Sequence, residues 1–189
     1  MIGTKGIPAR SGGVERHVEE VAVRLVKTGV DVTVYSRPWY TRRTRDTRYR
    51  GVHIRSLWSL RTKHFDAISH TILSVIDALR NKSDIIHFHG IGPALLSPFV
   101  RLTSRARVVT TFHCQDYYHQ KWGRVARFAL RAGEWCAVRW SHELIVVSRE
   151  LERHVWGTYH RTSRYIPNGA SVERINDRRA EKILRAFKI

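Results

Sequence analysis

DIIHFHG at positions 84–90 and RVVTTFHC at positions 107–114 decide the fold of this chain. Each is a short run of apolar and β-branched residues that ends in polar ones, and a helix-length stretch separates the two. This arrangement predicts two parallel strands joined by a helical crossover. Runs that are apolar on both faces are typical of strands that helices cover from both sides.

The same alternation of strand and helix patterns continues outward from these two runs. Further strands are predicted at positions 30–35, 52–55, 143–147 and 164–167, and helices at 14–27, 65–79, 94–103, 125–138 and 149–155. Ser148 follows a strand and is suited to cap the last of these helices. The pattern predicts an α/β fold with one doubly wound, Rossmann-like parallel sheet over residues 1–170.

The two termini of the sequence suggest an incomplete first strand and a linker. Only residues 1–2 can serve as a strand ahead of the first glycine-rich loop, so we expect the first strand to be incomplete. A charged helix is expected at 175–188, after a Pro-Asn-Gly turn. We expect residues 171–189 to be a linker towards a second domain that this chain lacks.

Charge points to anionic partners. The chain of 189 residues carries 34 Lys+Arg against 16 Asp+Glu, a net charge of +18. The segment 37–63 holds nine basic residues and one acid, Asp46. An anionic membrane, a phosphorylated substrate and nucleic acid are all compatible with this segment, and so is an ordinary solvated surface. We find no helix-turn-helix, zinc-finger or RNP signature, which makes nucleic acid the weaker option.

Targeting signals and cysteines indicate the compartment. The N-terminus has no apolar stretch of secretory-signal length, and no window approaches the roughly 18 apolar residues of a membrane span. Two cysteines, Cys114 and Cys136, make neither a disulfide framework nor a paired zinc motif. We expect a cytoplasmic protein with reduced thiols, located at the inner face of the membrane if the basic segment docks there.

A glycine-rich loop joins residues 1–2 to the first predicted helix. It reads GTKGIPARSGG at positions 3–13 and includes Gly12 and Gly13 at the helix start. Glycines permit a tight backbone, and a helix N-terminus offers unpaired N–H groups to an anion. The glycine spacing fits neither the dinucleotide-binding fingerprint nor a Walker loop, so a tight turn that only packs the helix is equally compatible.

Histidines follow the two strands quoted at the outset. His87 and His89 are two residues apart on one strand and share a face, and His113 follows the next strand. Because ligands bind parallel sheets at the carboxyl ends of strands, these residues are candidates for a site. One interpretation is a metal site of three histidines, without an evident fourth ligand. Another is Cys114 as a nucleophile paired with His113, although adjacent residues on an extended segment point apart.

The favoured interpretation is a polar pocket that handles hydroxyl protons. In it, His89, His113 and Asp116 line the pocket. The following segment, Asp116 to Gly123, interleaves aromatic and hydrogen-bonding residues and includes Trp122, which suits the apolar faces and hydroxyls of a sugar. Such residues also serve as hydrogen-bonded core or as surface anchors, most readily in the case of His87.

These segments together resemble family-4 glycosyltransferases of the GT-B fold, and most of all their bacterial rhamnosyltransferase-like branch. The resemblance rests on GTKGIPARSGGVE at 3–15, VEE at 18–20, DIIHFHG at 84–90, TTFH at 110–113, VVS at 146–148 and IPNG at 166–169. The motifs follow the order of the family and span nearly the whole chain.

The resemblance implies the acceptor-side, N-terminal domain of a retaining transferase with two Rossmann-like domains. His113 matches a histidine close to the transferred sugar, Gly12 and Gly13 match a loop that approaches donor phosphates or acceptor, and Asn168 matches the turn towards the second domain. The nucleotide-sugar donor would bind mainly to that second domain, with its basic pair and paired glutamates. No metal and no other cofactor is expected.

The sequence thus predicts sugar transfer to a carbohydrate or lipid-linked acceptor in cell-surface polysaccharide synthesis, with little activity for this chain alone. The alternatives are a non-catalytic basic module that binds an anionic membrane or nucleic acid, and a subunit that completes a cleft with a separate polypeptide.

Overall fold

The computed structural model describes residues 1–42, 45–62, 65–118 and 122–169. The strands are β1 (Thr33–Ser36), β2 (Thr47–Tyr49), β3 (Val52–Ser56), β4 (Ile85–His89), β5 (Arg107–Phe112), β6 (Glu143–Val146) and β7 (Arg164–Tyr165). The helices are α1 (Gly13–Lys27), α2 (Pro38–Thr41), α3 (Phe65–Arg80), α4 (Ser97–Thr103), α5 (Arg124–Trp140) and α6 (Arg149–Tyr159), with 3-10 turns η1 (Pro93–Leu96) and η2 (Asp116–Tyr118).

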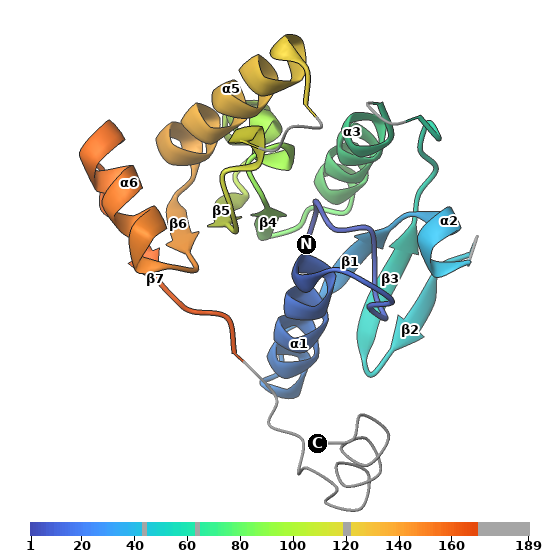
Figure 1. Cartoon of the computed structure of the whole chain (residues 1–189). Helices are drawn as coiled ribbons and strands as arrows, with labels where there is room; N and C mark the ends of the chain where they lie inside the picture. Colours follow the sequence, from blue (N-terminus) through green and yellow to red (C-terminus); the bar gives the residue numbers. More distant parts are fainter. Residues whose placement is uncertain (43–44, 63–64, 119–121, 170–189) are drawn as a thin grey trace, which may run out of the picture.

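The strands form two sheets that lie side by side (Figure 1). One has the order β1-β3-β2 and the other β4-β5-β6-β7. All pairs are parallel except β2 with β3. Ile2 makes an isolated parallel bridge to Phe88 of β4, and the main chain of Met1 accepts a hydrogen bond from Tyr35 of β1. The first two residues therefore link the two sheets.

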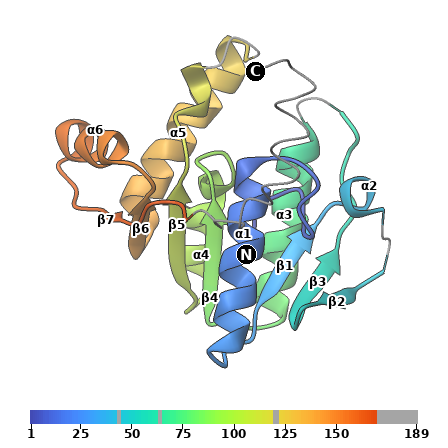
Figure 2. The same cartoon turned by 60° about the horizontal axis from the view of Figure 1, so that its bottom comes forward.

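Helices cover both faces of this arrangement (Figure 2). α1 packs its apolar stripe on β1 and β3, where Val18 and Ala22 are fully buried among Val34 and Ile54. A larger core joins the second sheet to α3, α4, α5 and α6 and is centred on Phe88 and Phe112. Strands enclosed on both faces explain the continuous apolar runs of the sequence.

The doubly wound α/β fold predicted from the sequence is confirmed, and most element bounds agree within a few residues. The prediction of one parallel sheet was too simple, because the hydrogen-bonded strands form two sheets and β2 is antiparallel to β3. Ser148 caps α6, since its side chain accepts a hydrogen bond from the N–H of Leu151 at 3.2 Å. The helix expected at 94–103 is divided into η1 and α4. The short elements β2 and α2 were not predicted, because three or four residues are too few to show the hydrophobic periodicity of a strand or a helix.

None of the helices in the described parts of the chain is both long and apolar enough to cross a bilayer. The predicted helix at 175–188 and the linker 171–189 lie outside the described residues, as do His119, Gln120 and Lys121 of the segment that follows β5.

Candidate functional site

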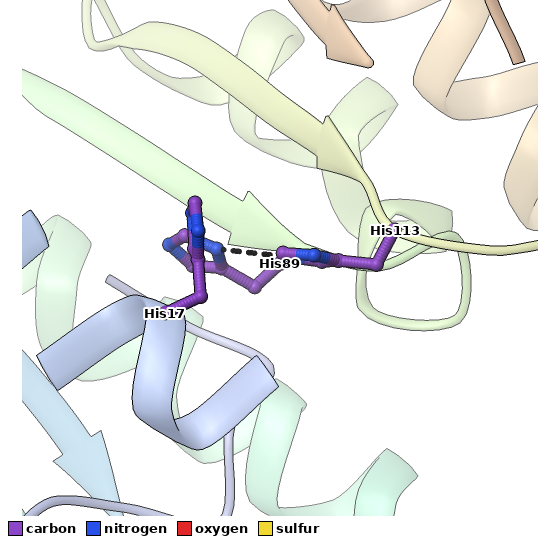
Figure 3. A group of neighbouring side chains, drawn as sticks. All are labelled: His17, His89 and His113. Carbon is purple, nitrogen blue, oxygen red and sulfur yellow. Dashed lines mark hydrogen bonds between the residues drawn. The ribbon is translucent and has the colours of Figure 1, made fainter. Parts of the chain in front are cut away.

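Three histidines from separate elements meet at the carboxyl ends of β4 and β5 (Figure 3). His89 is the last residue of β4, His113 directly follows β5, and His17 projects towards both from the second turn of α1. Nδ1 of His89 lies 3.3 Å from Nε2 of His113 in a hydrogen bond. The ring of His17 makes edge contacts with the rings of His89 and His113 at centroid distances of 5.7 and 5.0 Å.

Burial keeps this cluster uncharged. It lowers the pKa of His113 to about 4 and that of His89 well below its usual range. Burial also lowers the pKa of His17, against a hydrogen bond that its ring makes to the side chain of Asn168, which raises it. At neutral pH His89 and His113 are therefore neutral, and only one of their two facing nitrogens carries a proton. Neutral imidazoles can both accept and donate a hydrogen bond, as the handling of hydroxyl groups requires.

His87 lies beside the cluster and has a different environment. Its ring stacks on His89 at 4.1 Å, which confirms that the two side chains share a face. Its Nε2 is paired with Oγ1 of Thr111 at 2.8 Å, and burial lowers its pKa to about 3. His87 is therefore a half-buried histidine whose Nε2 is paired with Thr111 and whose ring packs against His89.

The glycine loop approaches the same rim from the other side. Gly3, at φ 108°, passes so close to β4 that a Cβ would lie 2.6 Å from the carbonyl oxygen of His89. Gly12 is the N-cap of α1 at φ 98° and provides no side-chain cap. Gly12 and Gly13 are both exposed, and nothing lies within 4 Å of a Cβ built on Gly13. The start of α1 is thus open at Gly13, while the carboxylate of Glu15 lies against Gly12.

The rest of the loop is held by the protein's own side chains. The N–H groups of Lys5 and Ala9 donate to the carboxylates of Glu15 and Glu19, at 3.2 and 2.6 Å. Arg10 and Ser11 both donate their N–H groups to the hydroxyl of Tyr40. These bonds occupy loop N–H groups that could otherwise bind an anion, and they fix the shape of the loop. An anion would therefore bind at the N–H groups of the start of α1.

The remaining predicted site residues surround the cluster less closely. Asp116 begins η2 and accepts a hydrogen bond from the thiol of Cys114 at 3.2 Å. Trp122 lies half-buried just ahead of α5. Asn168, from the turn that the sequence matched to the interdomain segment, hydrogen-bonds His17. The structure therefore brings His89, His113 and Asn168 together, with Gly12 and Gly13 about one helical turn from His17 on α1.

His17 was not predicted from the sequence. Its neighbours Val14, Val18 and Val21 form the apolar stripe of α1, and a single histidine beside such a stripe does not by itself suggest a function. One signal was available, since a polar residue near the start of α1 must lie over the carboxyl ends of the parallel strands.

These three histidines also form a geometrically possible metal site. Each offers one ring nitrogen, and these atoms lie within 4.8 Å of one another. Three imidazoles with an open position are a known zinc ligand set. The trio differs from the one considered from the sequence, because His17 takes the place of His87.

The basic segment 37–63 is partly neutralised. Arg37 is buried and its Nη1 lies 2.8 Å from Oδ2 of Asp66, while Arg55 forms ion pairs with Asp46 and Asp77. Arg43 and Lys63 lie outside the described residues. The exposed arginines of the segment are Arg42, Arg45, Arg48, Arg50 and Arg61.

Comparisons with known proteins agree with the fold. The family model described as Glycosyltransferase Family 4 matches residues 11–174. Among solved structures, a chain of sucrose-phosphate synthase from Thermosynechococcus elongatus is similar, with a TM-score of 0.60 and 13% identity over 94% of this chain and 97% of the matched one. A search of curated proteins found no match.

Proposed function

Because the chain belongs to Glycosyltransferase Family 4, we propose that it forms the acceptor-side half of an enzyme that transfers a sugar from a nucleotide diphosphate to a carbohydrate or lipid-linked acceptor. The transfer retains the anomeric configuration and serves cell-surface polysaccharide synthesis. The observation that carries this proposal is the neutral histidine cluster beside the open start of α1. A second domain binds most of the nucleotide and closes the cleft.

The chemistry of transfer fits such a rim. The bond between the anomeric carbon and the diphosphate breaks, the acceptor oxygen bonds to that carbon, and the proton of the acceptor hydroxyl passes to an oxygen of the departing diphosphate. Negative charge grows on the departing diphosphate, and the N–H groups of Gly13 and Val14 with the positive end of α1 stabilise it. The carboxylate of Glu15 works against this at the same helix end, although its bond to Lys5 ties it into the loop.

The neutral state of the histidines has its own advantage. The reacting sugar acquires positive, oxocarbenium-like character, and a charged imidazolium beside it would raise the barrier. In the proposed mechanism His113 orients a sugar hydroxyl or the acceptor proton, while His89 and Asp116 position the acceptor. Trp122 offers its ring to the apolar face of a sugar.

Replacement of His113 in the two-domain enzyme tests the proposal. We expect His113→Ala to lower kcat/KM for transfer about 100-fold, the lower end of the range for a lost proton-handling group. The assay follows release of nucleoside diphosphate from a panel of UDP-, GDP- and dTDP-sugars. His160→Asn, a change at an exposed histidine after α6, is the matched control. Unchanged turnover in His113→Ala would remove this residue from the mechanism.

We further propose that the enzyme works at the cytoplasmic face of a membrane that carries its acceptor. Trp58 and Phe65 are 62% and 58% exposed, and Ile68 is exposed on the same side of α3 one turn later. Ser59 and Leu60 hydrogen-bond the first turns of α3, so the segment that carries Trp58 and Arg61 lies beside the start of this helix. Apolar side chains flanked by arginine suit an anionic bilayer surface.

Vesicle binding tests this location. We expect the protein to sediment with vesicles that contain anionic lipid and to be released as salt is raised. Trp58→Ser combined with Phe65→Ser should abolish sedimentation, whereas Phe128→Ser, which alters an exposed side chain on α5, should not. Sedimentation that is independent of lipid charge, or tighter binding to unrelated DNA than to vesicles, would contradict the proposal.

A further inference from the structure

The histidine cluster consists of three side chains that commonly bind metal ions. His17, His89 and His113 come from α1, from β4 and from the residue after β5, and one ring nitrogen of each lies within 4.8 Å of the other two. Imidazole nitrogen is a preferred ligand of Zn²⁺, and three imidazoles with an open fourth position form a complete protein ligand set. Mg²⁺ and Ca²⁺ prefer oxygen ligands, so the cluster does not suit them.

The distance between His89 and His113 has the value that a shared metal ion requires. Nδ1 of His89 and Nε2 of His113 are 3.3 Å apart. Two nitrogens bound at about 2.0–2.1 Å to one tetrahedral Zn²⁺ lie about 3.3–3.4 Å from each other. A hydrogen bond from an N–H group is usually shorter, about 2.7–3.2 Å to an oxygen acceptor. The two nitrogens are therefore already spaced as two corners of a tetrahedral site.

His17 supplies the third ligand from another direction. Figure 3 shows its ring standing across the other two rings, and its plane is inclined by 63° to that of His89 and by 80° to that of His113. Its ligand nitrogen, within 4.8 Å of the others, has to approach by at most about 1.5 Å to reach the tetrahedral spacing. The side chain is half-buried, so rotation about its own bonds can provide this movement.

Contacts outside the cluster hold two of the three rings. A histidine that binds a metal through one nitrogen usually donates the N–H of the other nitrogen to a neighbouring group, which orients the ring. The side chain of Asn168 hydrogen-bonds the ring of His17, and the ring of His87 stacks on His89 at 4.1 Å. Nε2 of His89, by contrast, is buried without a hydrogen-bond partner in the described part of the chain, which weakens binding and favours a reversibly bound ion.

We propose that His17, His89 and His113 bind one Zn²⁺ ion and that the bound ion reversibly inhibits sugar transfer. The inhibition rests on the function proposed above for these side chains. The ion takes up the nitrogen lone pairs that would accept a hydrogen bond from a sugar hydroxyl. It also places two positive charges beside the carbon that becomes oxocarbenium-like, which raises the barrier. Zn²⁺ is thus an inhibitor of this enzyme and not its cofactor.

Calorimetric titration of the EDTA-treated chain with ZnCl₂ tests the site without any measurement of activity. We expect one ion per chain, with a Kd that rises at least about 100-fold in His17→Ala and in His113→Ala and about tenfold in Asn168→Ala, which loses only an outer contact. Two controls should bind as the parent does. They are His160→Asn, which removes an exposed histidine, and Cys114→Ser, which removes the exposed thiol next to His113.

The absorption spectrum of the chain loaded with Co²⁺ identifies the ligands. Intense d–d bands without a thiolate charge-transfer band are expected for three imidazoles at a tetrahedral site. A thiolate band that disappears in Cys114→Ser would assign the metal to this cysteine and overturn the inference. An equal Kd for Zn²⁺ in His17→Ala and the parent would overturn it as well, provided that both have the same Tm in EDTA.

Kinetics of the two-domain enzyme test the inhibition separately. At ten times its Kd, Zn²⁺ should lower turnover about tenfold, because about ten in eleven molecules then hold the ion, and EDTA should restore the full rate. His17→Ala should turn over at the same rate with and without this zinc. Binding at the cluster without loss of transfer would contradict the inhibition. Failure of the proposed sugar transfer is seen differently, as full activity of His113→Ala in EDTA, where no metal is bound.

Discussion

At the residue scale, the site depends on histidines that burial holds neutral. His89 is only 2% exposed and shares a proton with His113, while His17 connects this pair to Asn168 in the last described segment. A single solvated histidine would be half protonated near pH 6.5. Here desolvation moves that change well into the acid range for His89 and His113, so this pair keeps both hydrogen-bonding roles throughout the physiological range.

His17 is expected to be a positioning residue. In the two-domain enzyme, His17→Ala should lower kcat/KM about tenfold, because the ring of His113 loses its edge contact and Asn168 loses its partner. His17→Gln keeps an amide that can bond Asn168 and should recover most of the loss. Steady-state kinetics of both variants check this. A glutamine variant as impaired as the alanine variant would show that Asn168 is not the relevant contact.

At the element scale, the glycine loop and α1 form one unit. Helix carboxylates accept hydrogen bonds from the loop, with Glu15 and Glu19 bonded to Lys5 and Ala9. Sharp turns with positive φ are needed to bring the loop against β4 and then into the helix. The unit places the start of α1 over the strand ends, where an anion can bind.

Substitution of Gly3 tests how closely the glycine loop packs against β4. Gly3→Ala should lower the free energy of unfolding by about 3 kcal/mol, since it combines a positive φ with overlap against the carbonyl of His89 and the ring of Pro93. Gly157→Ala is the matched control. It lies inside α6 with no atom within 4 Å of its Cβ, and should stabilise by about 0.5–1 kcal/mol. Urea unfolding measures both, and equal effects would contradict the prediction.

At the scale of the whole molecule, folding buries several histidines at once. Burial lowers the pKa of His70 and of His113 to about 4, and that of His87 to about 3. The unfolded chain takes up these protons as the pH falls through about 6.5, whereas the native state resists until its own lower pKa is reached. Stability is therefore full above pH 6.5 and declines between about pH 6.5 and 3.

Urea unfolding at pH 7 and pH 5 measures this decline. Each such histidine should cost about 2 kcal/mol at pH 5, since one pKa unit corresponds to about 1.4 kcal/mol. His70→Leu removes one contributor, away from the candidate site, and should reduce the loss between the two pH values by that amount. A loss of stability that is identical in the variant and the parent would show that His70 titrates normally in the native state.

The sequence by itself determined the α/β fold, the order of its main strands and helices, the cap at Ser148 and the alignment of His87 with His89. These follow from local rules, namely apolar periodicity, capping and alternation along a strand. Short elements such as β2 lie below the length at which those rules give a signal.

Only the tertiary structure decided which histidines meet. His17 joins His89 and His113 because α1 crosses the ends of β4 and β5, and His87 turns instead to Thr111. The tertiary structure also decided that Arg37 is buried in an ion pair with Asp66 and does not contribute to a basic surface. It likewise decided that a cavity lies between β1 and β4. Contacts between residues far apart in the chain depend on how elements pack, and local patterns in the sequence indicate that packing only in part.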